Sequence, residues 1–284
     1  MNNHGIAKII IIIWLFCIGN AEVSAQIKLN FGVYTSDKPT IMVRKFRPML
    51  NELESILSNN LHEQVTIKMH IAKNYKRGLS NITQGKVDFT RLGPATYVQA
   101  KIENPAIHIL AMESEKGKKE FNGVICVRNK SAIKNIRDIK GKRFAFGNQQ
   151  STIGRYLVQQ FLYRAGLKIS DLRRHVYFNR HDQVAYAVAS GDFDAGALKE
   201  STYKRLVKKG LPINKLITFK NITKPWVARA NLPLKQLQAL QKSLLSFHAI
   251  TKISHYKKNP FLESSDSDYS TTRQSILESK LFFD

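Results

Sequence analysis

Strand patterns alternate with helix patterns along this chain, and this alternation constrains its fold more than any other feature. Residues 27–33 alternate apolar and polar side chains as a strand does, and apolar residues between 46 and 57 then recur at helical spacing. The same order continues with strands at 65–71, 87–92 and 107–112 and helices at 75–84 and from 95 onward. Strands that alternate with helices predict an α/β lobe with a mostly parallel sheet flanked by helices.

The pattern restarts after Phe121 and predicts a second lobe of the same class. Strands are expected at 123–127, 143–146, 176–178, 193–197 and 216–219, and helices at 153–165, 181–189 and 202–209. Residues 225–228 look like a return crossing, and a helix follows at 234–247. We therefore expect one lobe from residues 26–121 plus 226–284, another from 122–225, and hinge crossings near 121 and 225. Two crossings favour a cleft that closes by hinge motion.

The stretch from Gly141 to Gly154 predicts a site for an anion. Residues 143–146 form the expected strand, and a polar turn leads to Ser151 and Thr152 at the start of a helix. A helix start has backbone N–H groups without partners and a partial positive charge. Two hydroxyls add donors, so the segment suits a tetrahedral oxyanion. The alternative is that Ser151 or Thr152 is only an N-cap. The spacing of a nucleotide P-loop is absent, which disfavours ATP.

The first 25 residues have the pattern of a secretory signal peptide. Lys8 precedes an apolar run over residues 9–18, and Val23-Ser24-Ala25 provides a cleavage site before Gln26. The apolar run is too short to span a bilayer comfortably. We expect a cleaved, periplasmic product, with an uncleaved anchor as the alternative.

The chain is strongly basic, with 45 Lys and Arg against 21 Asp and Glu and a net charge of +24. Removal of residues 1–25 takes away one lysine and one glutamate, so the charge stays the same. A nucleic-acid partner is disfavoured because the chain is exported and its lysines are scattered without interleaved aromatic residues. The charge either covers a solvated surface or attracts anions or an anionic membrane. We expect a monomer.

Four stretches, in the same order, resemble the signatures of the phosphate/phosphite/phosphonate substrate-binding proteins of ABC transporters. Residues 85–97 are similar to G-x-V-D…G-P-A-S-Y, and 138–154 to D-L-K-G-K…F…S-T-S-G. Residues 181–196 are similar to H-D…A-V…G-x-x-D-A-G, and 261–273 to F…D-x-D-Y…R. The resemblance implies a two-lobed periplasmic-binding-protein fold of type II, with the oxyanion held between the lobes.

The resemblance also implies which residues bind the ligand. The Pro94-Ala95-Thr96 turn on the first lobe and Ser151 to Gly154 on the second would hold the oxyanion from opposite sides. Tyr75 matches a family tyrosine that reaches the phosphonate, and His181 matches a histidine that lines the cleft. Their alternatives are a helix-start aromatic and a capping or core imidazole. The full set expected to bind the ligand is Tyr34, Tyr75, Arg91, Pro94, Ala95, Thr96, Phe121, Ser151, Thr152, Ile153, Gly154 and His181.

Two of these positions rest on further arguments. Tyr34 ends the first strand at its carboxyl end, where α/β clefts receive ligands. Arg91 lies two residues before the Gly93-Pro94 turn, and a guanidinium beside the cleft suits phosphorus oxyanions. The alternative for Arg91 is a structural or solvent-facing arginine.

Departures from the family pattern narrow the ligand. Ile153 replaces a residue that usually carries a hydroxyl, and Phe121 stands where an aromatic hydroxyl is common. Members that bind aminoalkyl phosphonates use acidic groups for the amine, and one such place falls at Ser201. Glu200 is adjacent, but consecutive helical residues do not share a face. We therefore expect phosphate, phosphite or a simple alkylphosphonate rather than an aminophosphonate.

The first hypothesis for function is a periplasmic receptor that delivers its ligand to an inner-membrane ABC permease. The second is a sensory receptor of the same fold that docks on a membrane-bound kinase or cyclase. An enzyme is disfavoured because the eight histidines lack metal-ligand spacing and Ser151 lacks a glycine-flanked elbow. Cys126 lies in an apolar strand, which favours a packing role. We expect no catalytic residue, metal or cofactor.

Overall fold

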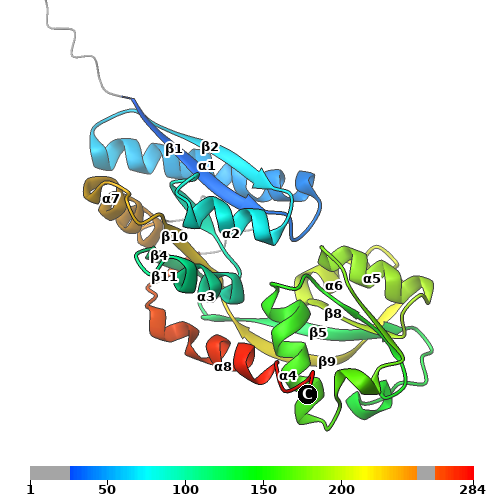
Figure 1. The fold of residues 1–284 in the computed structure, drawn as a ribbon. Helices are drawn as coiled ribbons and strands as arrows, with labels where there is room; N and C mark the ends of the chain where they lie inside the picture. Colours follow the sequence, from blue (N-terminus) through cyan, green and yellow to red (C-terminus); the bar gives the residue numbers. More distant parts are fainter. Residues whose placement is uncertain (1–25, 248–259) are drawn as a thin grey trace, which may run out of the picture.

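The computed structural model describes residues 26–247 and 260–284, which fold into two α/β lobes (Figure 1). The expected signal peptide, residues 1–25, lies outside this part of the chain. Within the described ranges, no helix combines the length and the apolar character needed to cross a bilayer.

The first lobe is built on a six-stranded sheet in the order β11-β4-β10-β3-β1-β2. Its strands are β1 (Ile27–Tyr34), β2 (Val65–Ala72), β3 (Phe89–Arg91), β4 (His108–Glu113), β10 (Pro225–Ala228) and β11 (Phe261–Leu262). Its helices are α1 (Pro39–Leu61), α2 (Tyr75–Thr83), α3 (Pro94–Glu103) and α7 (Leu234–Leu245). β1 runs parallel to β2 and β3, whereas β10 is antiparallel to β3 and β4, and β11 to β4.

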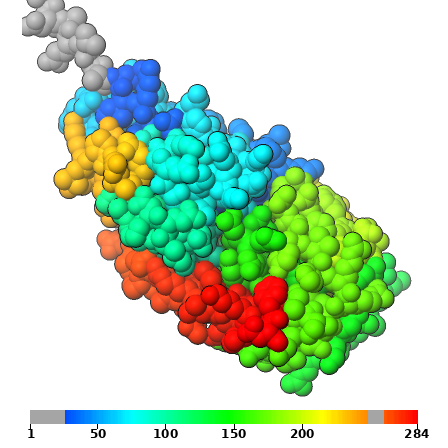
Figure 2. Space-filling model, viewed as in Figure 1, coloured from blue at the N-terminus to red at the C-terminus, as the bar shows by residue number. Residues whose placement is uncertain are grey.

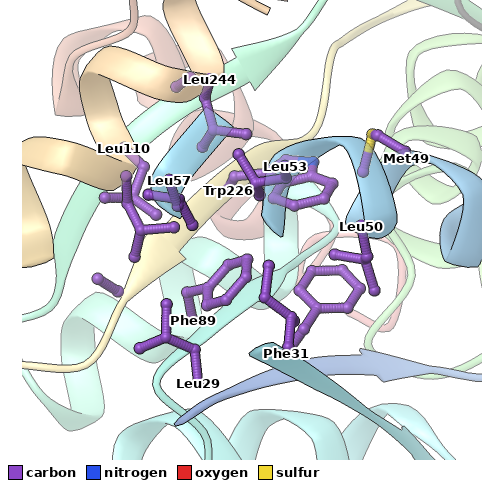
Figure 3. Close-up of a cluster of buried hydrophobic side chains, with 14 of the residues drawn as sticks. Leu29, Phe31, Met49, Leu50, Leu53, Leu57, Phe89, Leu110, Trp226 and Leu244 are labelled. Carbon is purple, nitrogen blue, oxygen red and sulfur yellow. The ribbon is translucent and has the colours of Figure 1, made fainter. Parts of the chain in front are cut away.

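An apolar face of α1 and the sheet form the core of this lobe (Figure 3). The face includes Phe46, Leu50 and Leu53, which have no solvent exposure. The ring centres of Phe31 on β1 and Trp226 on β10 lie 4.8 Å apart, so side chains of these strands stack although β3 lies between them in the sheet. Burial of such aromatic pairs ties together segments that are distant in sequence.

The second lobe has a five-stranded sheet in the order β7-β6-β8-β5-β9. Its strands are β5 (Glu120–Arg128), β6 (Arg143–Phe146), β7 (Arg174–Tyr177), β8 (Ala195–Lys199) and β9 (Ile213–Ile222). Its helical segments are η1 (Ile136–Ile139), η2 (Thr152–Leu157), α4 (Val158–Arg164), η3 (Ile169–Asp171), α5 (His181–Ser190) and α6 (Glu200–Val207). β6 is parallel to β7 and β8, whereas β5 is antiparallel to β8 and β9.

Both sheets are therefore mixed, where the sequence predicted mostly parallel sheets. The cause lies in the strands that enter each lobe from the hinge. β10 begins beside the carboxyl end of β3, with Trp226 opposite Arg91, and β5 begins beside the carboxyl end of β8, with Gly123 opposite Lys199. A strand that starts where its neighbour ends has to run antiparallel to it.

Two chain crossings join the lobes and lie side by side. One runs through residues 114–119 between β4 and β5, and the other through residues 223–224 between β9 and β10. The Thr223 N–H donates to the Lys119 carbonyl at 2.7 Å, and the Glu113 N–H donates to the Lys224 carbonyl at 2.9 Å. These bonds make the two crossings one connected hinge.

The predicted boundaries assign the C-terminal segment to the first lobe, but the segment runs on to the second lobe. It contains η4 (Asp266–Tyr269) and α8 (Ser270–Glu278), and it begins on the first lobe, where the Tyr97 hydroxyl donates to Asp266 at 2.5 Å. Its end, coloured red in Figure 2, lies against the second lobe. There Phe282 is fully buried. Periodicity predicts that such a helix forms but carries no information on which apolar surface receives its end.

Candidate functional site

A small cavity lies between the two lobes. The first lobe contributes Tyr34, Ser36, Tyr75, Arg91, Gly93 and Pro94, and the second lobe and hinge contribute Phe121, Ser151, Thr152, Ile153, His181, Lys199, Asn221 and Lys224. The centre of a water molecule can occupy about 30 Å³ of this space. The closed form therefore has room for a ligand of few heavy atoms, far below the size of a drug-sized pocket.

The second lobe presents the Ser151-Thr152 turn to the cavity. This turn opens η2, a π-helical segment, and π-helical turns occur frequently at functional sites. The Ser151 hydroxyl accepts the Gly154 N–H at 3.0 Å, so Ser151 is an N-cap and also lines the cavity. The N-cap alternative therefore holds for Ser151, and its binding of the ligand stays a prediction.

Gly154 lies behind this turn and does not line the cavity. Its carbonyl accepts the Gly147 N–H at 2.7 Å, and its own N–H is bonded to Ser151. A Cβ on Gly154 would lie 2.5 Å from the Gly147 Cα, which explains why both positions are glycine. The Gly154 N–H is therefore already engaged within the lobe.

The first lobe meets this turn through the start of α3. Pro94 occupies the first helical position, where its missing N–H costs nothing, and it lines the cavity. The Ala95 N–H donates to the Thr152 hydroxyl at 2.9 Å, and the Thr96 hydroxyl donates to the Gln150 carbonyl at 3.3 Å. Ala95 and Thr96 thus form hydrogen bonds to the opposite lobe instead of lining the cavity.

Two stacked tyrosines form the first-lobe wall. The rings of Tyr34 and Tyr75 lie 4.0 Å apart, and the Tyr34 hydroxyl accepts the Gly93 N–H at 2.5 Å. Burial raises the pKa of Tyr34 and of Tyr75, because an ionised phenolate would lose its hydration. Both hydroxyls therefore stay protonated and available to donate.

Arg91 lines the cavity and is also structural. Its side chain forms a two-point ion pair with the Glu113 carboxylate, at 2.7 and 2.9 Å. Burial by itself raises the pKa of Glu113, but Arg91 and Lys45 outweigh burial and hold that pKa well below its usual value. Burial lowers the pKa of the Lys45 ammonium to about 7.

Two cavity lysines, Lys199 and Lys224, were missed in the sequence analysis. The Lys224 ammonium lies 3.6 Å from the ring centre of Phe121, and the Lys199 ammonium lies 5.8 Å from it. Burial lowers the pKa of both lysines, with further lowering by neighbouring cations. Lys199 ends a strand at the cleft edge, which is the only local signal among many scattered lysines.

His181 and Asn221 complete the cavity wall, and Asn221 was also missed. They are 7 % and 5 % exposed. Their Nδ1 and Nδ2 atoms have no hydrogen-bond partner among the residues that the structure describes. Burial, followed by the charges of Lys199 and Lys224, lowers the pKa of His181 to about 3, so its imidazole is neutral. Buried polar atoms that lack a partner in a cavity wall point to a ligand that pairs with them.

The cavity has no acidic lining residue. Ser201 is exposed and outside it, and Glu200 instead bonds Asn122 at 3.2 Å and Lys204 at 3.1 Å. Within residues 26–247 and 260–284, no cluster of His, Cys, Asp or Glu is placed to hold a metal ion. The site is thus a small space lined by hydroxyl donors and three cationic side chains.

The family model of the ABC transporter, phosphonate, periplasmic substrate-binding protein matches residues 31–269. The chain belongs to this family. Its members are periplasmic substrate-binding proteins of phosphonate, phosphite and phosphate ABC transporters, and the two lobes have their type II fold. The resemblance noted in four sequence stretches is thereby confirmed.

Individual relatives agree with the family match. The chain is 26% identical over 246 residues to the probable ABC transporter phosphite binding protein PhnD1 of Prochlorococcus marinus, covering 82% of this chain and 80% of that protein. A crystal structure of that PhnD1 with methylphosphonate has a TM-score of 0.74 at 23% identity and covers 87% and 96% of the two chains. A phosphonate-transporter binding protein from Pseudomonas aeruginosa has a TM-score of 0.78 at 20% identity and covers 91% and 88%. These structures support the fold.

Proposed function

We propose that this family member captures a small phosphorus oxyanion without an amine in the cavity and delivers it to an inner-membrane ABC permease. Phosphate, phosphite and short phosphonates form this ligand class. One relative is described as a phosphite-binding protein and has been crystallised with methylphosphonate, and another, from Mycolicibacterium smegmatis, is described as a phosphate-import protein. No observation on the described residues favours the sensory alternative.

One observation supports this ligand class above the others. The residues that line the cavity include three cations, five hydroxyl-bearing side chains in Tyr34, Ser36, Tyr75, Ser151 and Thr152, and no carboxylate. An aminophosphonate would bring an ammonium group next to Lys199 and Lys224 with no acidic partner. A small anion without an amine meets donors on every side, and charge-assisted hydrogen bonds of this kind are the strong ones.

The residues have four roles in this proposal. Tyr34, Tyr75, Ser151 and Thr152 donate to the oxyanion, and Arg91 supplies charge at the cavity wall. Pro94, Phe121, Ile153 and His181 shape the space, while Ala95, Thr96 and Gly154 hold the loops that carry the donors. Closure brings the donors of the two lobes together and excludes water, which strengthens each hydrogen bond.

The proposal includes export through the N-terminal segment and a role in binding without catalysis. The family places its members in the periplasm, and the pattern of residues 1–25 fits cleavage before Gln26. The neutral His181 imidazole has no carboxylate partner among the described residues that could orient it as a general base.

A ligand screen tests the proposal. Thermal melting of residues 26–284 is measured with phosphate, phosphite, methylphosphonate, aminoethylphosphonate and sulfate. A ligand that binds only the folded form raises the melting temperature, so we expect shifts with the first three anions and little or none with aminoethylphosphonate. A larger shift with aminoethylphosphonate than with methylphosphonate contradicts the proposed ligand class.

A further inference from the structure

One wall of the cavity presents three donors whose arrangement follows from strand register. Asn221 on β9 lies opposite Phe121 on β5, and Lys199 on β8 lies opposite Gly123 on β5. Residues directly opposite one another, and residues two apart on one strand, share a face of the sheet. Lys199 and Asn221 therefore flank Phe121 on the same face of the sheet, and this face lines the cavity.

Lys224 reaches this wall from the hinge. Its ammonium sits 3.6 Å from the centre of the Phe121 ring, which the Lys199 ammonium approaches to 5.8 Å. The nearby Glu113 carboxylate is occupied by Arg91. Neither Lys199 nor Lys224 forms an ion pair in the part of the chain that the structure describes. Both ammonium groups lie near the Phe121 ring, and an anion bound beside them would offset their like charges.

Asn221 provides independent evidence for an acceptor at this wall. Its side chain is 5 % exposed, and its Nδ2 donor has no partner among the described residues. A buried amide donor without an acceptor lowers stability, so a ligand oxygen placed here would bond a group that now has none. Lys199, Lys224 and the Asn221 amide are therefore all suited to bind an anionic group that accepts hydrogen bonds.

The hydroxyl groups proposed to hold the phosphorus oxyanion come from other elements. Tyr34 and Tyr75 belong to the first lobe, and Ser151 and Thr152 to the turn before η2. Two separate sets of donors therefore face one small space. The hydroxyl set is neutral, whereas the second set includes the two ammonium groups of Lys199 and Lys224 and the Asn221 amide, so the second set suits a further anionic group.

We propose that the ligand carries a second anionic group and that Lys199, Asn221 and Lys224 bind it. This inference rests on the proposed function and narrows its ligand to a phosphorus oxyanion with a carboxylate or a second phosphoryl group. The small cavity requires that few atoms separate the two groups. An alkyl substituent would leave the three donors without an acceptor, and an amine would be repelled.

Calorimetry on residues 26–284 compares ethylphosphonate with phosphonoacetate and with methylenediphosphonate. One charge-assisted pair amounts to at least about a tenfold gain, so we expect one of the two doubly acidic probes to bind at least about tenfold more tightly than ethylphosphonate. The tighter of them identifies the second group as carboxylate or phosphoryl. Ethylphosphonate binding as tightly as both overturns the inference but leaves the proposed function intact. Failure of all phosphorus oxyanions to bind overturns the proposed function itself.

Charge variants test the residues. Lys199→Met and Lys224→Met should each reduce the ratio between the doubly acidic probe and ethylphosphonate, and together they should bring it near unity. Lys209→Met removes an exposed lysine of the same lobe and should keep the ratio. The ratio is the readout because a general loss of closure weakens both ligands equally. A ratio that survives in the double variant, or collapses in Lys209→Met, contradicts the assignment. Where the lysine variants fail to fold, the wild-type ratio decides.

Discussion

The bond between the lobes at Thr152 gives the sharpest test of how closure and binding are coupled. The Thr152 hydroxyl accepts the Ala95 N–H at 2.9 Å across the cleft, and both residues are buried in the closed form. In an open form, water can satisfy that N–H. Thr152→Val keeps the side-chain shape but removes the acceptor. Closure then removes water from the Ala95 N–H and leaves it without a hydrogen-bond partner.

This unsatisfied donor gives the smallest effect to expect, because Thr152→Val also removes a hydroxyl that is proposed to donate to the ligand. A buried N–H without an acceptor costs about 1–3 kcal/mol. Because the open form escapes this cost, ligand affinity should fall by about fivefold to about 150-fold. Thr152→Ser is the matched control, since it keeps the hydroxyl and should remain close to wild type.

Calorimetry with methylphosphonate and with phosphite measures the affinities, and circular dichroism confirms that both variants fold. X-ray scattering adds an independent readout, because the valine variant should populate a more extended form at a given ligand concentration. If the ligand affinities of Thr152→Val and Thr152→Ser differ by no more than about twofold, the hydrogen bond between Ala95 and Thr152 does not contribute to binding and the reasoning fails.

Three further predictions concern the Asp37–Arg205 ion pair, the packing of the Ser151–Gly154 turn, and pH. Asp37→Asn removes a partly exposed ion pair with Arg205, at 2.8 and 3.0 Å, that joins the lobes. The substitution should weaken anion binding about two- to fivefold at low salt and less at high salt, and variant and wild-type affinities that are equal at both salt concentrations contradict this. Gly154→Ala should lower stability by roughly 1–3 kcal/mol in chemical unfolding, since its Cβ collides with the backbone of Gly147; an unchanged midpoint refutes this. Because burial lowers the pKa of Lys45 to about 7 in the folded protein, the unfolded chain holds more protons above that pH, so the free energy of unfolding of the ligand-free protein should rise from about pH 7 to about pH 10. A bound anion stabilises the ammonium form of Lys45 and so raises its pKa. Ligand binding at about pH 8 should therefore take up protons, as measured by calorimetry in buffers of different ionisation enthalpy. Proton release would contradict the lowered pKa of Lys45.

The sequence predicted those parts of the site that depend on local chemistry. Ser151 and Thr152 could be found because a strand, a polar turn and a helix start follow one another within a few residues. Nine of the twelve expected residues line the cavity, and the other three, Ala95, Thr96 and Gly154, hold the neighbouring loops. Whether each binds the ligand stays a prediction.

The parts that the sequence did not predict depend on long-range register. Lys199 joins the site because β8 pairs with the hinge strand β5, and Lys224 because the return crossing passes beside Phe121. The antiparallel strands have the same origin, since local periodicity does not show from which side a strand enters its lobe. The position of Phe282 likewise depends on a surface that the rest of the chain builds.

The path of the C-terminal segment limits how the molecule can open. Glu278 receives hydrogen bonds from Gln160 at 2.8 Å and from Arg164, and Phe282 is anchored among second-lobe side chains, while Tyr97 ties the start of the same segment to the first lobe. The halves therefore share three tethers rather than two. A pivot far from α8 would stretch the third tether, so the axis of rotation has to pass close to that helix. The mouth of the cavity then widens on the side opposite α8, and a solute enters from there.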